Sequence, residues 1–155
     1  MQFGLSTDDP APADYDGDGV ADVAIWREND TTYNTPTFYV LNSSNSSLLE
    51  QSYGQAGDEL AIADYDGDGK ADFAIRRGNT WHYTGSNSLT NQAVTWQQAT
   101  DIAVPNDYDG DGKADIAVWR ESSGAWFIKH SSGIADRTTN WGQTGDIPVP
   151  AFYRR

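Results

Sequence analysis

The sequence predicts an all-β fold made of repeated four-stranded antiparallel units. Short runs of alternating apolar and polar residues are separated by Gly, Asn and Ser, which is typical of β-meanders. An aspartate-rich segment recurs with its first Asp at positions 14, 64 and 107, and these intervals suit one four-stranded unit each. No stretch keeps apolar residues at the helical spacing of about 3.6 residues, so we expect no helix.

The 155 residues form a single repeat domain in this interpretation. It consists of repeat 1 at about 3–52, repeat 2 at about 53–95, repeat 3 at about 96–140, and a partial fourth repeat at 141–155. The fourth copy has Phe152, Arg154 and Arg155 where the others have Asp, Asp and Gly. We therefore expect no metal site at that end.

The pattern places four short strands in each unit. In repeat 2, residues 59–63 lead into the aspartate loop, and residues 72–77 leave it with strict alternation. An aromatic strand follows at 81–83, and the fourth strand lies at 93–96. The other two complete repeats show the same order of strands.

Each aspartate loop, at 14–22, 64–72 and 107–115, has the composition of a Ca²⁺ cage. Ca²⁺ takes about six to eight oxygen ligands, which a short loop supplies when every second side chain turns inward. Aspartates occupy loop positions 1, 3, 5 and 9, glycine at position 6 permits a sharp turn, and position 7 offers its backbone carbonyl. The sequence thus predicts three calcium ions per chain. The predicted ligands are Asp14, Asp16, Asp18, Val20 and Asp22; Asp64, Asp66, Asp68, Lys70 and Asp72; and Asp107, Asp109, Asp111, Lys113 and Asp115.

The loops differ from an EF-hand, which closes with Glu at position 12 between helices. Here the closing Asp is at position 9 and the flanks read as strands. Zn²⁺ would require His or Cys, which the loops lack, and Mg²⁺ usually keeps several waters. A metal-free Asp/Gly turn is the alternative for a single copy. Three copies with the same four Asp argue against it, and an empty loop would be costly because carboxylates about 5 Å apart repel by roughly 3 kcal/mol per pair.

Charge and composition exclude several classes of partner. The formal charge is −13, and the three loops hold twelve of the 23 acidic residues, while the ten Lys and Arg are scattered. We therefore expect no nucleic-acid partner. No run of about 18 apolar residues exists, so we expect no membrane span, and the N-terminus lacks a signal-peptide pattern. The absence of Cys excludes a disulfide scaffold.

The loops have the form Asp-x-Asp-x-Asp-Gly-x-x-Asp, and an aromatic-Gly pair precedes three of the repeats, at Phe3-Gly4, Tyr53-Gly54 and Trp141-Gly142. In these features the chain resembles the FG-GAP and VCBS-type repeats, including those of integrin α-subunit propellers. Trp96-Gln97 departs from the aromatic-Gly element. The resemblance implies blade-like repeats of a β-propeller type, Ca²⁺ in the loop between adjacent strands, and an extracellular or cell-surface setting for adhesion or recognition.

We therefore expect a non-enzymatic, extracellular calcium-binding module with a structural or adhesive role. Its expected partners are other copies of itself, joined head to tail, as a filament or in a shared ring, unless the chain is part of a longer propeller. One alternative is a lectin-like propeller that binds glycans through exposed Trp and Tyr, and another is an accessory domain of a secreted enzyme.

Residues outside the loops carry no recognisable catalytic motif. Gly-x-Ser-x-Gly and P-loop patterns are absent, and His82 and His130 are isolated, so we expect surface or packing roles for both histidines. Three arginines recur at one position of the second strand, where we expect them to form salt bridges or to cover the sheet. These are Arg27, Arg77 and Arg120.

Overall fold

The computed structural model describes residues 3–87 and 90–149, which contain twelve β-strands and no helix. The prediction of an all-β fold with three four-stranded antiparallel sheets is confirmed. The strands are β1 (Asp9–Pro10), β2 (Val23–Arg27), β3 (Thr37–Leu41), β4 (Leu48–Ser52), β5 (Glu59–Leu60), β6 (Phe73–Arg77), β7 (Thr80–Thr84), β8 (Asn91–Thr95), β9 (Ile102–Ala103), β10 (Ile116–Arg120), β11 (Ala125–Lys129) and β12 (Arg137–Asn140).

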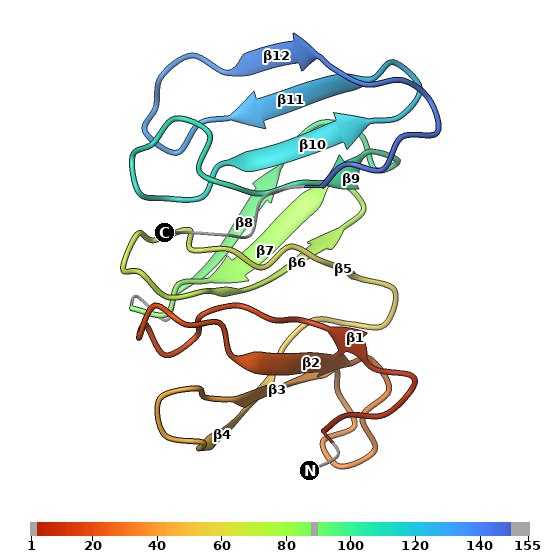
Figure 1. Ribbon diagram of the computed structural model, residues 1–155. Coiled ribbons are helices and arrows are strands. Elements are labelled where there is room, and N and C mark those ends of the chain that lie inside the picture. The colour runs from red at the N-terminus through yellow and green to blue at the C-terminus, as the bar shows by residue number, and fades with distance from the viewer. Residues whose placement is uncertain (1–2, 88–89, 150–155) are drawn as a thin grey trace.

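Each sheet is a simple meander whose strands follow chain order. The sheets are β1-β2-β3-β4, β5-β6-β7-β8 and β9-β10-β11-β12, and every neighbouring pair is antiparallel. Figure 1 shows them one above the other, with β1–β4 at the bottom and β9–β12 at the top. The three sheets do not close into a ring.

The first strand of each sheet is shorter than the sequence predicts. In repeat 2 we expect a strand at 59–63, but β5 ends at Leu60, and beyond it only a hydrogen bond from Ala61 N to the Ala74 carbonyl and the isolated bridge between Ala63 and Asp72 continue the pairing. Repeats 1 and 3 have proline in this gap, at Pro12 and Pro105. Proline fits there because this position donates no hydrogen bond to the second strand: the bonds on either side, such as Ala11 N to the Ala24 carbonyl and Asp22 N to the Ala13 carbonyl, are both present.

The apolar core lies between consecutive sheets. Phe73 of the second sheet packs on the first, with its ring 5.3 Å from that of Tyr15 and 5.0 Å from that of Phe38. Ile116 of the third sheet packs in the same way on a cluster of the second that includes Trp81. Period-two alternation in the second strands thus directs one face of each sheet toward its neighbour.

An aspartate in the turn before each first strand forms a salt bridge with the arginine of the second strand. Asp8 accepts both Nε and Nη2 of Arg27, at 2.9 and 2.8 Å, and two further pairs repeat this contact. The other pairs are Asp58 with Arg77 and Asp101 with Arg120. The prediction that these arginines form salt bridges is confirmed, and Arg27 and Arg120 also lie over aromatic rings of the next strand.

The partial fourth repeat forms the turn but no strand within residues 141–149. Gln143 N donates to Asp146 Oδ2 at 2.9 Å, as the corresponding backbone groups do in the complete repeats. Phe152, Arg154 and Arg155, which replace the aspartate-loop residues, lie outside the described residues.

Candidate metal centres

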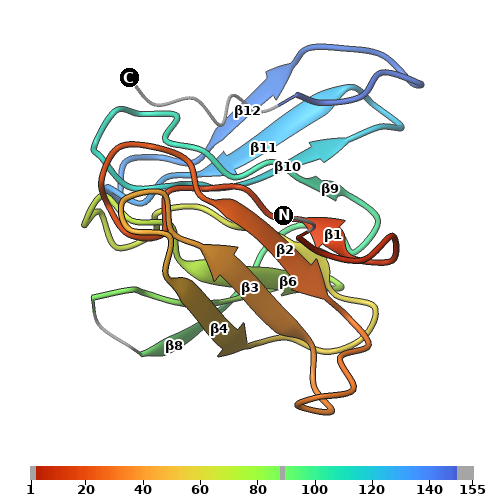
Figure 2. The same cartoon turned by 60° about the horizontal axis from the view of Figure 1, so that its bottom comes forward.

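Each aspartate loop joins the first and second strands of its sheet. Figures 1 and 2 both show the three loops on one side of the stacked sheets. Consecutive loops are hydrogen-bonded, because Ala71 N donates to the Asp14 carbonyl and Ala114 N to the Asp64 carbonyl, each at 2.6 Å. The loops therefore form a continuous row rather than three separate surface turns.

The structure brings the carboxylates of each loop together. Three ligand oxygens lie within 4.8 Å of one another in each of three groups: Asp14, Asp16 and Asp18; Asp64, Asp66 and Asp72; and Asp107, Asp109 and Asp111. Asp22 and Asp68 are not part of these groups, and Asp115 belongs to a fourth group with Asp109 and His130. Carboxylate oxygens at this separation match the donor set of a hard divalent cation.

The aspartate at position 1 shapes the loop from within. Asp14 accepts the N–H of Gly17 at 2.6 Å through Oδ1 and that of Gly19 at 2.8 Å through Oδ2. Asp64 and Asp107 make the same two contacts in their loops. Gly17 and Gly19 have φ of 82° and 85°, a region in which L side chains are strained, which explains why glycine alternates with Asp here.

The aspartate at position 9 anchors the loop to the rest of its sheet. Asp22 is 1% exposed and accepts the N–H of Tyr15 at 2.8 Å and that of Ser43 at 2.7 Å. Asp72 and Asp115 are fully buried and have equivalent partners. These aspartates thus combine a structural role with the ligand role that the sequence predicts.

Sequence reasoning missed the tyrosine at position 2. The hydroxyls of Tyr15, Tyr65 and Tyr108 donate to the carbonyls of Ala11, Ala61 and Val104. Burial raises the pKa of the Tyr108 hydroxyl to about 12 and that of the Tyr15 hydroxyl further. Tyrosine recurs in the motif Asp-Tyr-Asp-Gly-Asp-Gly, so its spacing alone could have marked it as part of the loop.

A second missed set is the hairpin cap, which we define as the second and third residues after the third strand in each sheet. Its first serine donates Oγ to the position-5 aspartate, as Ser43 does to Asp18 at 2.8 Å. Its second residue donates to the position-3 aspartate, as Ser44 does to Asp16 at 2.6 Å. The cap consists of Ser43 and Ser44, Ser86 and Asn87, and Ser131 and Ser132.

Position 7 contributes backbone as well as side chain. The N–H of Val20, Lys70 and Lys113 donates to the position-5 aspartate of its own loop. The Lys70 side chain lies across Gly17 of the preceding loop, and that of Lys113 lies across Gly67. The expectation that their carbonyls bind metal stays a prediction.

Local surroundings shift two loop carboxyl groups in opposite directions. Burial raises the pKa of Asp72 to about 6, although N–H donors from Ser86 and Tyr65 partly oppose this effect. The hydrogen bond from the Ser44 hydroxyl lowers the pKa of Asp16. A divalent cation in the second loop would favour the ionised form of Asp72, which burial disfavours.

No protein-family model and no curated protein matches this chain. Since residues 3–87 and 90–149 include no helix, they offer none that could cross a membrane. The class that these residues define is an all-β repeat protein with several acidic clusters able to hold a metal ion.

Proposed function

We propose that this chain is a non-enzymatic calcium-binding β-repeat protein of the FG-GAP/VCBS type. One Ca²⁺ occupies each of the three aspartate loops, and the ions have a structural role. The sheets act as propeller-type blades in an extracellular or cell-surface setting. The resemblance of the loop motif supports the family and the setting, and the repeated loop geometry supports the metal.

One observation carries the proposal: three equivalent loops each gather carboxylate oxygens within 4.8 Å of one another. The arginines of the second strands pair with Asp8, Asp58 and Asp101, which lie outside the loops. Each pair of carboxylates about 5 Å apart repels by roughly 3 kcal/mol at an effective dielectric near 20. The attraction of each carboxylate to a bound divalent ion would offset this repulsion.

The structural role follows from what the loops connect. The position-9 aspartate bonds the loop to the hairpin cap, and the Ala71 N–H bonds the second loop to the first. An ion in each loop would therefore hold the first, second and third strands of one sheet and the start of the next. Binding free energy at such a site adds directly to folding free energy.

Calorimetry with calcium tests the proposal, and the chain offers a matched pair of variants. The unaltered chain should bind three Ca²⁺, and Asp66→Asn should bind two, because it removes a proposed ligand of the second loop. Asp136→Asn makes the same chemical change at an exposed residue outside the loops and should keep three. Fewer than two sites in the unaltered chain, or equal stoichiometry in both variants, would contradict the proposal.

We also propose that copies of the chain associate head to tail, because the two ends of the sheet stack expose apolar side chains. Val23 of the first sheet is 56% exposed, whereas its counterpart Ile116 is 8% exposed against the preceding sheet. At the other end, Val149 is 84% exposed, whereas its counterpart Val104 is fully buried. A second copy would cover Val23 as the second sheet covers Ile116 within the chain.

The glycan alternative predicts exposed aromatics at equivalent places of each sheet. Trp26, Trp81 and Trp119 are instead at most 1% exposed and belong to the core. Trp141 is 77% exposed, but its counterparts Tyr53 and Trp96 are half-buried. We therefore propose no glycan site.

A further inference from the structure

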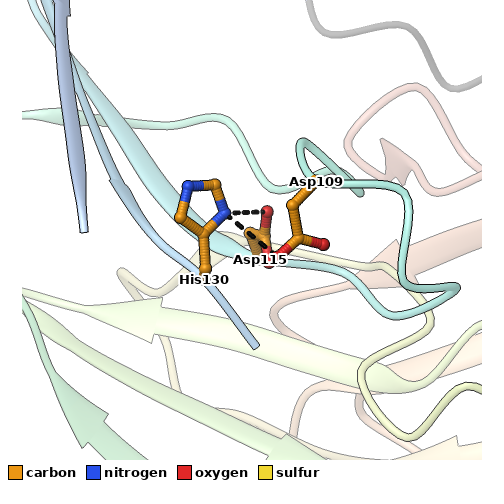
Figure 3. A group of neighbouring side chains, drawn as sticks. All are labelled: Asp109, Asp115 and His130. Atoms are coloured by element: carbon orange, nitrogen blue, oxygen red, sulfur yellow. Dashed lines mark hydrogen bonds and ion pairs between the residues drawn. The ribbon is translucent and has the colours of Figure 1, made fainter. Parts of the chain in front are cut away.

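His130 gives the third loop a nitrogen donor from outside the loop itself. It directly follows β11 and precedes the hairpin cap, so the strand aims its imidazole at the aspartates (Figure 3). Nδ1 lies 3.0 Å from Asp115 Oδ2 and 3.4 Å from Asp109 Oδ2. The His130 side chain is 4% exposed, and the two carboxylates are 0% and 8% exposed.

The shorter of these separations is also that of a hydrogen bond, and both match ligands that share one small metal ion. Two donor atoms at about 2.1 Å from Zn²⁺ are about 3.0 Å apart at a right angle and about 3.4 Å apart at a tetrahedral angle. One ligand atom of each residue lies within 4.8 Å of the others. Imidazole with carboxylates is a donor set that late first-row transition metals accept, whereas Ca²⁺ takes oxygen.

The other two loops provide an internal comparison. The residue in the position of His130 is Asn42 in the first repeat and Gly85 in the second. Asn42 Oδ1 is buried without a hydrogen-bond partner among the described residues, so this place supplies an oxygen in one repeat and no side-chain donor in another. The position thus changes donor chemistry from repeat to repeat while the aspartates stay the same.

We propose that the third loop also accepts a late first-row divalent metal ion in place of Ca²⁺, with His130 Nδ1, Asp109 and Asp115 as its nitrogen and oxygen ligands. His130 is the residue that determines this specificity. The inference rests on the proposed metal-binding function of the loops and narrows it for one of them. The sequence argues against zinc because the loops themselves contain no His. That argument does not hold for the third loop, because His130 follows β11 and lies beside two of its aspartates.

The test is a Zn²⁺ titration of the chelator-stripped full chain by calorimetry, together with the imidazole ¹⁵N resonances. The unaltered chain should show one Zn²⁺ site tighter than any other, and Zn²⁺ should shift the Nδ1 resonance of His130. His130→Asn and His130→Gly introduce the residues of repeats 1 and 2 and should weaken that site by at least about tenfold. His82→Asn removes the other histidine, which lies on β7, and should leave the site unchanged.

Zinc affinity that is equal in the unaltered chain and in both His130 variants would overturn the proposal and leave His130 as a hydrogen-bonded packing residue. An Nδ1 resonance unmoved by Zn²⁺ would also overturn it. Calcium titrations of the same proteins separate this inference from the proposed function. His130-dependent zinc binding without any calcium binding would support the inference and contradict calcium as the resident ion.

Discussion

At the scale of single residues, the repeated aspartates divide their work between holding the chain and offering oxygens to a cation. Asp14 and its counterparts accept N–H groups of the loop, and Asp22 and its counterparts tie the loop to the hairpin cap. A carboxylate oxygen can accept a hydrogen bond and still bind a cation, so these contacts preorganise the donors. The loop geometry is thus specified by many short contacts, most of which are made by Asp, Gly, Tyr and Ser.

A buried aspartate outside the loops illustrates a purely structural role. Asp30 is 4% exposed, and the Tyr39 hydroxyl that donates to it at 2.6 Å lowers its pKa to about 2, with help from the N–H groups of Tyr33 and Thr32. Since this value is below the ordinary 3.8, ionised Asp30 stabilises the fold above about pH 4, and this contribution is lost as pH falls toward 2.

Asp30→Asn should therefore lower the free energy of unfolding at neutral pH, because it removes the charge that these donors stabilise. The difference from the unaltered chain should shrink as pH falls from about 4 to about 2. Denaturant unfolding at a series of pH values measures it, and loss of calcium in acid affects both proteins alike. A difference independent of pH would show that Asp30 does not act through its charge.

At the scale of elements, the row of loops is the feature that joins the sheets. Ala71 N and Ala114 N each donate to the backbone carbonyl of the first aspartate in the preceding loop. In each case a lysine side chain also packs against the glycine at position 4 of that preceding loop. A Cβ on Gly67 would meet Lys113 Cγ at 2.9 Å, whereas one on Gly110 meets nothing within 4 Å among the described residues. Loops 2 and 3 thus interlock through side-chain packing as well as through a backbone hydrogen bond.

Gly67→Ala should destabilise the protein more than Gly110→Ala does. Both glycines have φ of 81°, so both substitutions should incur a left-handed penalty of about 1–2 kcal/mol. Only the first also displaces Lys113, because Cγ is close to the backbone and cannot swing away freely. Chemical unfolding in excess calcium gives both values, and equal losses would mean that the lysine cover contributes nothing.

At the scale of the whole molecule, three ions would act on a fold of three stacked sheets. Within residues 3–87 and 90–149 the sheets make no hydrogen-bonded ladder with one another, so their association depends on the apolar clusters between them, on the row of loops and on side-chain hydrogen bonds such as those from Arg76 to the carbonyls of Gln98 and Asp101. Removing the ions would restore the repulsion among the carboxylates of the three loops, which hold twelve of the 23 acidic residues. We therefore expect removal of the ions to lower the stability of all three sheets.

Stripping calcium should lower the melting temperature strongly and reversibly. One site contributes about 2.7 kcal/mol when calcium is at 100 times its Kd, and three such sites are comparable with the typical total stability of about 5–15 kcal/mol. Scanning calorimetry with chelator, followed by calcium or magnesium, measures the effect, and only calcium should restore the original melting temperature. An unchanged melting temperature in chelator would contradict a structural role for the ions.

Association between copies should depend on Val23. Val23→Lys places a charge where the first sheet would meet another copy, and it should shift the calcium-loaded chain toward monomer in light scattering. Ile134→Lys is a matched control, since Ile134 is also 56% exposed but lies in the turn before β12. A chain that is monomeric at high concentration, or one that associates equally with either substitution, would contradict head-to-tail packing.

The sequence by itself determined the features that depend on local spacing. The alternation of apolar and polar residues after Asp22, Asp72 and Asp115 predicted the second strands, and the repeated Asp and Gly positions predicted the three loops. Both patterns could be read from the sequence because they depend on residues only a few positions apart. The short first strands escaped prediction, since the apolar content of residues 59–63 favours a full strand, whereas the structure keeps only isolated hydrogen bonds and one bridge after Leu60.

Only the tertiary structure decided what surrounds each loop. Ser43 and Asp22 are 21 residues apart, and His130 and Asp109 are also 21 apart, so no local pattern shows that they meet. The register of the second and third strands brings them together, because antiparallel pairing returns the chain to the loop after one hairpin. The same register packs loop against loop and turns an isolated histidine into a neighbour of two carboxylates.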